Sequence, residues 1–209
     1  MAGAIRRTFS SARNMQISGW ERRYQSRERP AEDFSLVPSR LLVETAANID
    51  PAKALDLACG TGRNALWLAE RGWKVTAVDG SRTAIRVLLD HASERRLNIN
   101  AHVSDLENHE FKIKPAAWDL IAICYYLQRD LFEPAKNGIV GGGILIAIAH
   151  LAGPDEEASA HRLRPDELKE YFQDWEMLHY FEGDSRDIAH KRPVAEIAVR
   201  KRWDVVNAA

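Results

Sequence analysis

The sequence contains only two cysteines in 209 residues, Cys59 and Cys124. Two cysteines cannot form the disulfide framework of a small secreted protein, and neither lies in a C-x-x-C pair or in a Cys/His cluster with zinc spacing. We therefore expect a protein of a reducing compartment, the cytoplasm, with no metal site.

Long apolar runs and an excess of one charge are also missing. No run approaches the roughly 18 apolar residues that a membrane helix needs. The 29 Lys and Arg residues against 30 Asp and Glu residues leave a net charge of -1, which gives no general attraction to nucleic acid or to an anionic membrane. With 45% apolar residues, the chain suits a single domain without nucleic-acid or membrane partners, and its oligomeric state stays open.

The first 19 residues contain no acid, but they include Arg6, Arg7, Arg13 and several serines. Transit peptides and disordered tails share this composition. Of the two, we expect a flexible basic tail over residues 1–19. A single domain over residues 20–209 follows it, and residues 20–48 form its helical cap region.

The most informative stretch is the glycine turn at residues 54–64, Ala-Leu-Asp-Leu-Ala-Cys-Gly-Thr-Gly-Arg-Asn. A short apolar run precedes Gly60 and a helical pattern follows it, so the stretch predicts a strand, a tight turn and a helix. Two classes of cofactor use such turns. The carboxylate of Asp56 would repel a pyrophosphate and attract an ammonium or a sulfonium group, so it favours a cationic ligand.

A second acid, Asp79, closes the next apolar run, which begins at Lys74. An acid at this distance from the glycine turn can accept hydrogen bonds from both hydroxyls of a ribose. Because both classes of cofactor contain ribose, Asp79 predicts a ribose contact without choosing between them.

The residues from Leu55 to Gly62 follow the form L-D-x-[GA]-C-G-x-G. This is the first motif of the class I S-adenosylmethionine-dependent methyltransferases, and the chain resembles that family from about residue 20 to residue 201. Arg63-Asn64 followed by Leu66-Trp67-Leu68-Ala69 is similar to its small tellurite-resistance and thiopurine type branch. The resemblance implies S-adenosylmethionine as methyl donor, no metal, and a small-molecule acceptor.

The resemblance also implies contacts with the cofactor. Asp105 would accept from the adenine amine while the Leu106 backbone donates to the ring; alternatively Asp105 is a helix cap or a loop acid. Arg23 would pair with the cofactor's carboxylate, or its segment is a surface helix with two anchoring aromatics. The predicted cofactor contacts are Arg23, Asp56, Ala58, Cys59, Gly60, Thr61, Gly62, Asp79, Gly80, Ser81, Asp105, Leu106, Cys124 and Tyr125.

Alternating strand and helix patterns predict an α/β fold, with a doubly wound, mostly parallel seven-stranded sheet, helices between the first five strands and an antiparallel terminal hairpin. The resemblance implies the strand order third-second-first-fourth-fifth-seventh-sixth of the Rossmann-like methyltransferases. Ligands in such sheets bind beyond the carboxyl ends of the strands. The expected strands are 54–57, 74–79, 99–103, 119–125, 144–150, 175–182 and 194–201, and the expected helices are 39–47, 64–70, 81–96, 130–136 and 164–173.

No catalytic residue is identified by the sequence. A thiolate or a tellurium or selenium oxyanion needs no base, whereas an alcohol, phenol or amine can need one. His150, at the end of the fifth strand, is the best-placed base, and a satisfied edge histidine is the alternative. The spacing Asp184-x-x-Asp187-x-x-His190 fits a metal site, but we expect a solvated loop there.

Three functions remain open at this stage. The first is a small-molecule methyltransferase, the second a regulator that binds S-adenosylmethionine without catalysis, and the third a nicotinamide oxidoreductase, against which Asp56 argues. Nucleobase and glutamine N-methyltransferases resemble the same fold but carry [DNS]-P-P-[FY] after the fourth strand. The segment Cys124-Tyr125-Tyr126-Leu127 has no proline, which disfavours that class.

Overall fold

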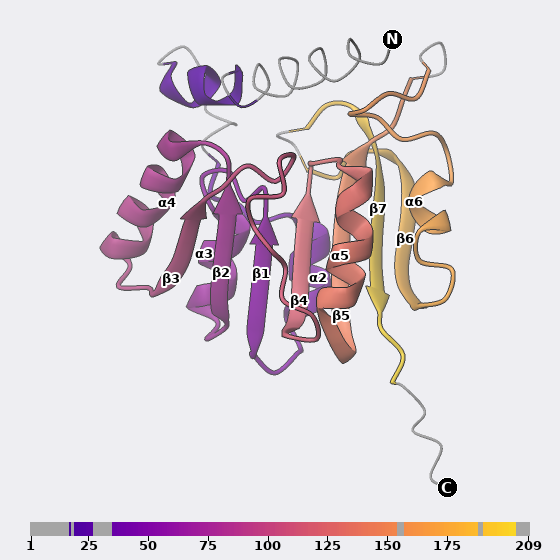
Figure 1. Ribbon diagram of the computed structural model, residues 1–209, viewed down its shortest axis with the longest axis horizontal. Coiled ribbons are helices and arrows are strands. Elements are labelled where there is room, and N and C mark those ends of the chain that lie inside the picture. Colours follow the sequence, from indigo (N-terminus) through magenta and orange to yellow (C-terminus); the bar gives the residue numbers. More distant parts are fainter. Residues whose placement is uncertain (1–16, 18, 27–34, 154–156, 188–189, 204–209) are drawn as a thin grey trace, which may run out of the picture.

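The computed structural model describes residue 17 and residues 19–26, 35–153, 157–187 and 190–203. Its centre is a seven-stranded sheet in the order β3-β2-β1-β4-β5-β7-β6, drawn in Figure 1. The strands from β3 to β5 run parallel, and β7 pairs antiparallel with both β5 and β6. The predicted order and terminal hairpin are confirmed. The strands are β1 Lys53–Leu57, β2 Lys74–Asp79, β3 Ile99–Val103, β4 Trp118–Cys124, β5 Ile139–His150, β6 Glu176–Asp184 and β7 Pro193–Arg200.

Helices lie on both faces of the sheet, with α5 in front and α2 and α3 behind in the view of Figure 1. They are α2 Arg40–Ala46, α3 Arg63–Glu70, α4 Arg82–Glu94, α5 Phe132–Gly138 after a 3-10 turn at Arg129–Leu131, and α6 Glu167–Glu170. Residues 19–25 are also helical. The side chain of Ser81 accepts from the backbone N–H of Ala84 at 3.1 Å and caps α4.

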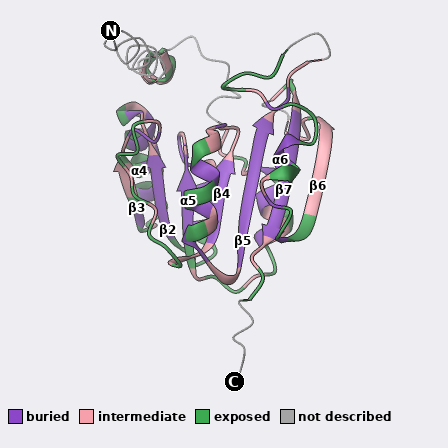
Figure 2. Ribbon diagram, turned by 45° about the vertical axis from the view of Figure 1, so that its right-hand side comes forward, coloured by how far each residue is buried: buried purple, intermediate pink, exposed green. Residues whose placement is uncertain are grey.

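Each face of the sheet carries its own apolar core, because successive strand residues point to opposite faces. On β4, Leu120 and Ala122 join the core beneath α2, α3 and α4, whereas Ile121 and Ile123 join the core beneath α5 and α6. Figure 2 shows the buried strands between helices whose outer surfaces are exposed. The apolar run of β4 is therefore that of a central strand covered on both sides.

The connection from β3 to β4 corrects one prediction. We expected a helix between each pair of the first five strands, but residues 104–117 contain none. His109 and Ala116 have φ angles of 55° and 42°, which no α-helix contains, and the side chain of Asp105 accepts from the backbone of Asn108 in a local turn at 3.0 Å. The connection is a loop that runs past the carboxyl end of the sheet.

Two element boundaries also differ from the prediction. Strand β5 begins at Ile139, so Gly141–Gly143 lies inside it, where a Cβ on Gly141 would come within 2.9 Å of the Trp203 ring. Helix α6 covers only Glu167–Glu170 and not residues 164–173. Asp166, at φ 62°, interrupts the chain after Pro165 and delays the start of the helix.

The domain boundaries stay a prediction, because residues 1–16 and 18 of the expected basic tail lie outside the described residues. Part of the expected cap region, residues 27–34, lies outside them as well. Among the residues described, no helix is long and apolar enough to cross a membrane.

Candidate functional site

A cavity of about 500 Å³ opens where β1, β2 and β4 end. Twelve of the fourteen predicted cofactor contacts line it, and Asp56 and Gly62 do not. Such a position, beyond the carboxyl ends of parallel strands and between β1 and β4, is where open α/β sheets bind ligands. The lining residues from the prediction are Arg23, Ala58, Cys59, Gly60, Thr61, Asp79, Gly80, Ser81, Asp105, Leu106, Cys124 and Tyr125.

The two glycines of the motif have different roles. A Cβ on Gly60 would lie 2.8 Å from the Tyr24 hydroxyl, so this glycine lets the helix of residues 19–25 approach the turn. A Cβ on Gly62, whose φ is 87°, would overlap the side chain of Leu88 on α4. Gly62 thus allows close packing of the turn on α4, and it is not part of the cavity wall.

Asp79 holds together the two segments that follow β1 and β2. Its Oδ2 accepts from the backbone N–H of Gly60 and its Oδ1 from that of Ser81, both at 2.8 Å. Burial raises the pKa of Asp79, these two hydrogen bonds lower it, and the charge of Glu21 raises it. Because each carboxylate oxygen can accept a second hydrogen bond, the side chain still has capacity for a ligand.

Asp56 lies beneath the turn with 1% of its surface exposed. Burial raises its pKa to about 7, the charge of Arg63 and the backbone N–H of Ala65 lower it, and the charge of Asp79 raises it. Its Oδ2 has no hydrogen-bond partner among the described residues. The carboxylate is therefore set one layer below the cavity, and its role toward a cationic ligand stays a prediction.

Asp105 lies in the cavity wall on the loop that follows β3. Its carboxylate accepts from the backbone N–H of Asn108 at 3.0 Å and from the Asn108 side chain at 2.6 Å. The backbone N–H of Asp105 donates to Glu110 at 2.9 Å. These contacts match the alternative that we expected, a loop acid. Asp105 and Leu106 both lie in the cavity wall, and the adenine contact stays a prediction.

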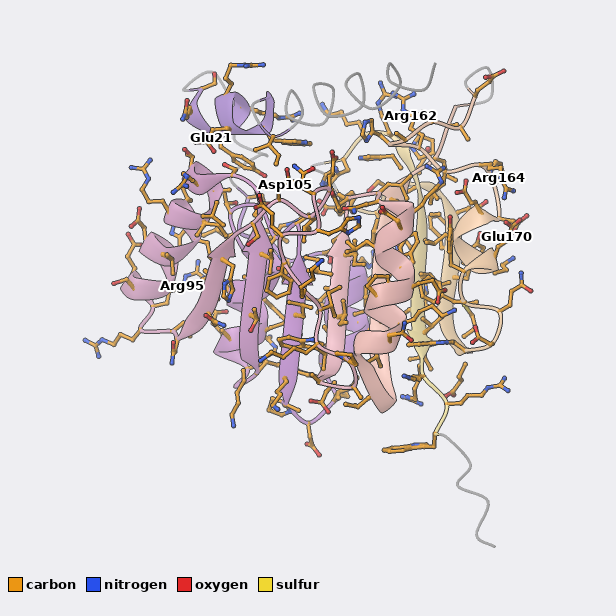
Figure 3. All side chains as sticks on the ribbon, viewed as in Figure 1. Glu21, Arg95, Asp105, Arg162, Arg164 and Glu170 are labelled. Atoms are coloured by element: carbon orange, nitrogen blue, oxygen red, sulfur yellow. The ribbon has the colours of Figure 1, made fainter. Side chains whose placement is uncertain are left out.

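The helix of residues 19–25 forms the roof of the cavity through Trp20, Arg23 and Tyr24. Glu21 ties this roof to the start of α4: it accepts from the Ser81 hydroxyl at 2.5 Å and from the Thr83 hydroxyl at 2.6 Å. Figure 3 shows Glu21 under the helix, at the same edge of the sheet as Asp105. The sequence prediction missed Glu21, although an acid in an otherwise basic aromatic segment was a signal for such a contact.

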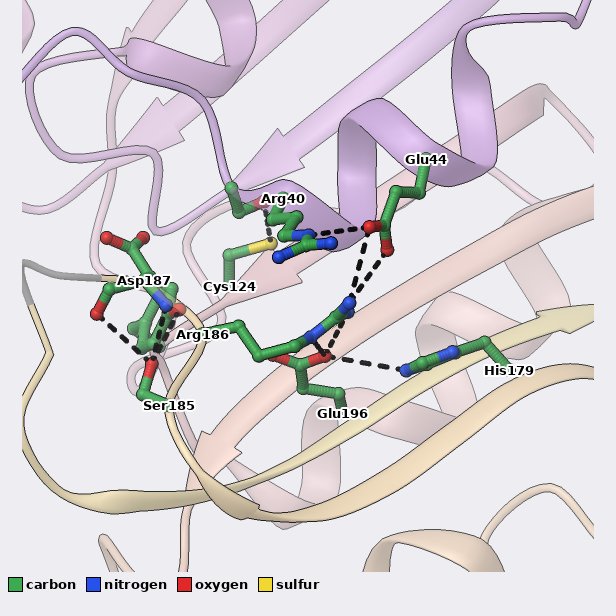
Figure 4. A network of polar contacts seen from close by, with 10 residues as sticks. Arg40, Glu44, Cys124, His179, Ser185, Arg186, Asp187 and Glu196 are labelled. Carbon is green, nitrogen blue, oxygen red and sulfur yellow. Dashed lines mark hydrogen bonds and ion pairs between the residues drawn. The ribbon is translucent and has the colours of Figure 1, made fainter.

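The opposite wall is built from aromatic rings and an ion pair. The ring of His190 stacks on Tyr125 with centroids 3.4 Å apart, and His150 lies 5.8 Å from Tyr125. Arg63 pairs with Asp187 at 2.5 Å, and Figure 4 shows Asp187 close to Ser185 in the same loop. The loop expected to be solvated is instead packed against the cavity. Among the described residues, no group of three or more His, Cys, Asp or Glu side chains is placed to hold a metal ion.

Ionisation on this wall is set mainly by burial. Burial lowers the pKa of His150, a contact with the Pro193 carbonyl raises it, and the charges of Arg192 and Arg162 lower it further. Burial also raises the pKa of Tyr125 far above its ordinary value. Near pH 7 both rings are therefore neutral, and the imidazole has a lone pair available.

One family model and several relatives match this chain. The family model described as "Tellurite resistance protein TehB" matches residues 31–192. A Haemophilus influenzae protein named probable S-adenosyl-L-methionine-dependent methyltransferase TehB is 30% identical over 155 residues, which are 68% of this chain and 52% of that protein. The chain thus spans about half the length of this relative.

Solved structures of similar fold include a TehB. The crystal structure of TehB from Haemophilus influenzae matches 88% of this chain and 66% of its own, with a TM-score of 0.66 and 26% identity. A Burkholderia thailandensis 1,6-didemethyltoxoflavin-N1-methyltransferase, with bound 1,6-didemethyltoxoflavin and S-adenosylhomocysteine, matches 97% and 92% with a TM-score of 0.68 and 16% identity, which supports the fold alone. On the strength of the family model, which covers most of its length, this chain belongs to the TehB tellurite resistance family.

Proposed function

We propose that this protein binds S-adenosylmethionine in the 500 Å³ cavity and transfers its methyl group to a small-molecule acceptor. The observation that carries the proposal is the placement of the glycine turn and Asp79 together at the switch point between β1 and β4. Membership of the TehB family supports it. The same membership argues against a nicotinamide oxidoreductase, a function with which the glycine turn alone is compatible.

The proposed pose follows from the chemistry of the wall. Asp79 accepts from the ribose hydroxyls with its remaining lone pairs, and Asp105 and Leu106 face the adenine. Arg23 lies in the roof, where its guanidinium is 5.1 Å from the centre of the Trp20 ring, and we assign it to the carboxylate of the methionyl group. Asp56 provides negative potential from below for the ammonium group.

When bound, S-adenosylmethionine supplies an electrophilic methyl group: the carbon–sulfur bond breaks, its electron pair stays on sulfur, and an acceptor lone pair forms the new bond. The protein's part is to hold the acceptor in line and to exclude water. We place the acceptor against Tyr125, His150 and His190. A thiol would pass its proton to the neutral His150, whereas a tellurium or selenium oxyanion has no proton to lose.

Two measurements test this function. Titration calorimetry with S-adenosylmethionine, S-adenosylhomocysteine and NAD should give binding of the first two and no binding of NAD; NAD binding without a signal from S-adenosylmethionine would overturn the proposal. Transfer of a labelled methyl group is then measured with thiols, selenite, tellurite and phenols. We expect transfer to a thiol or to an oxyanion. Binding without transfer to any of them would favour the regulator that binds the cofactor without catalysis.

A further inference from the structure

A second cavity, of about 610 Å³, lies at the other end of the sheet, where β1 and β2 begin. In Figure 1 this is the lower end of those strands, opposite the roof helix. Of the described residues that line it, four are cationic and none is acidic. The cations are Lys53, Lys74, Arg96 and Lys114.

The four cations come from separate parts of the chain. Lys53 begins β1 and Lys74 begins β2, and the two are direct partners in the parallel register of these strands. Arg96 follows α4, and Lys114 lies on the loop between β3 and β4. Folding therefore brings four like charges to one cavity, and adjacent like charges on neighbouring strands are unfavourable without a counter-charge.

The protein itself supplies little counter-charge. Within the part of the chain that the structure describes, none of the four side chains takes part in an ion pair or a hydrogen bond. Asp119 lies at the edge, but its Oδ2 accepts from the backbone N–H of Lys53 at 3.0 Å. Arg95, by contrast, pairs with Glu70 at 2.6 Å although it is the neighbour of Arg96. The cations of this cavity therefore lack the ion pair that their neighbour Arg95 has.

We propose that this cavity binds a small polyvalent anion of the phosphate type, such as a pyrophosphate group. The four cationic residues that line the hollow match several negative charges, and the hollow is of the size that small-molecule ligands occupy. Trp118, which is partly exposed, and the buried Trp73 also line the cavity. The overall charge of -1 makes a local anion site more fitting than a broad nucleic-acid surface.

The site is tested with inorganic pyrophosphate, titrated by calorimetry at low salt into the full chain and into two double variants, Lys53→Gln/Lys74→Gln and Arg96→Gln/Lys114→Gln. We expect each double variant to bind at least about tenfold more weakly, since each loses two of the four charges. Binding by the wild type should weaken as salt is added. Lys112→Gln is the matched control, because Lys112 is exposed on the same loop as Lys114 but does not line the cavity.

Two further measurements locate the bound anion. In nitrogen-labelled protein, the indole signals of Trp118 and Trp73 should shift on titration, while that of Trp175, buried in the core under α6, should not. Saturating S-adenosylhomocysteine should leave the affinity for pyrophosphate unchanged, because the two cavities lie at opposite ends of the sheet. This site does not depend on the proposed methyl transfer.

Three results would overturn the proposal. One is the absence of pyrophosphate binding at about millimolar concentration and low salt. Another is equal binding by the wild type and both double variants when their melting temperatures match. The third is binding of duplex DNA or of phosphatidylserine vesicles that pyrophosphate does not displace, which would assign the charges to a macromolecular surface.

Discussion

Carboxylates in the terminal hairpin and in the region of the glycine motif are stabilised by different means. In the terminal hairpin, Glu196 is 2% exposed and lies 2.7 Å from Arg186 and 3.4 Å from His179, as Figure 4 shows. In the region of the glycine motif, Asp79 accepts from two backbone N–H groups, and no side chain among the described residues forms an ion pair with it. In the hairpin, the charge of Glu196 is thus balanced by cationic side chains. In the motif region, the charge of Asp79 is stabilised by the dipoles of backbone N–H groups.

The difference separates a structural acid from one that remains available to a ligand. Arg186 balances Glu196 and also pairs with Glu44 of α2 at 2.9 Å. The ion pairs of the hairpin therefore connect β7 to α2. Peptide N–H groups carry no net charge, and the negative potential of the motif acids is therefore kept. A buried acid in this state has a raised pKa, and a cationic ligand would bring it back down.

The largest effect is expected from breaking the hairpin pair. Arg186→Ala leaves Glu196 buried without its arginine, which should lower the free energy of unfolding by about 3 to 5 kcal/mol. Denaturant unfolding measures this loss. Arg200→Ala is the control, because Arg200 pairs with Glu176 at an exposed site and should cost about 1 kcal/mol or less. Equal losses for the two variants would contradict the distinction between the regions.

Asp56 should make stability depend on pH. Its folded pKa of about 7 exceeds its ordinary value of 3.8, so the folded state binds more protons between these two values. The contribution of Asp56 to stability then falls as pH rises from about 4 to about 7, by about 4 kcal/mol at most. Asp56→Asn should remove this fall, measured from melting curves across the range. Asp90→Asn, at an exposed position on α4, should keep the pH dependence of the wild type.

The same variant tests the electrostatic role of Asp56. If Asp56 attracts a cationic group of the cofactor, Asp56→Asn should weaken S-adenosylmethionine binding more at low salt than at high salt. If Asp56 only braces the turn through the N–H of Ala65, the variant should lower thermal stability and leave the ligand-induced shift in melting temperature intact. That second outcome would refute the electrostatic role.

Asp79→Ala should weaken cofactor affinity by about 1.5 to 3 kcal/mol, the value of a hydrogen bond to a charged group. Calorimetry with S-adenosylhomocysteine measures it. The variant also loses the bonds to Gly60 and Ser81, so its melting temperature should fall. Asp79→Asn serves as the comparison, since it keeps one acceptor oxygen and should lose less. An unchanged affinity in a folded Asp79→Ala protein would exclude the ribose role.

The smallest effect is expected at the roof. Burial raises the pKa of Glu21, but hydrogen bonds from Ser81 and Thr83 outweigh it and hold the pKa below its usual range. Glu21→Gln removes the charge from these bonds and should weaken cofactor binding by about 1 kcal/mol, chiefly through faster dissociation, which stopped-flow fluorescence measures. Arg22→Gln, on the exposed side of the same helix, should dissociate at the wild-type rate, and so would Glu21→Gln if the roof had no part in retention.

The sequence predicted the features that follow from local chemistry. Glycines beside an acid predicted a turn between strand and helix, and the apolar run from Asp119 to Cys124 predicted a central strand, so the end of the sheet at which the cavity lies could be predicted. The order of the strands came from the family resemblance. Most of the predicted contacts do line one cavity, and their contact with a cofactor stays a prediction. A local pattern could not predict how deeply each side chain is buried. Asp56, a predicted contact, is buried beneath the cavity and does not line it.

The remaining errors come from contacts between residues far apart in the chain. Glu21 meets Ser81, and Arg63 meets Asp187 across more than a hundred residues; no periodicity or motif encodes such pairs. The loop that carries His190 seemed solvated because its composition is polar. It is packed in the structure because Arg63 and Tyr125 give its charge and its ring specific partners.

The order of the sheet has a consequence for synthesis on the ribosome. Strand β7 is the last to be made, yet it lies between β5 and β6 and pairs with both. Domains form from the amino terminus as the chain emerges, so the motif region can assemble around β1, β2 and β4 while β5 still exposes one of its edges. That edge is apolar, and until residues 193–200 emerge it is the part of the nascent chain most exposed to aggregation. Slow translation near the end of the message should therefore lower the yield of folded protein more than the same delay between β2 and β3.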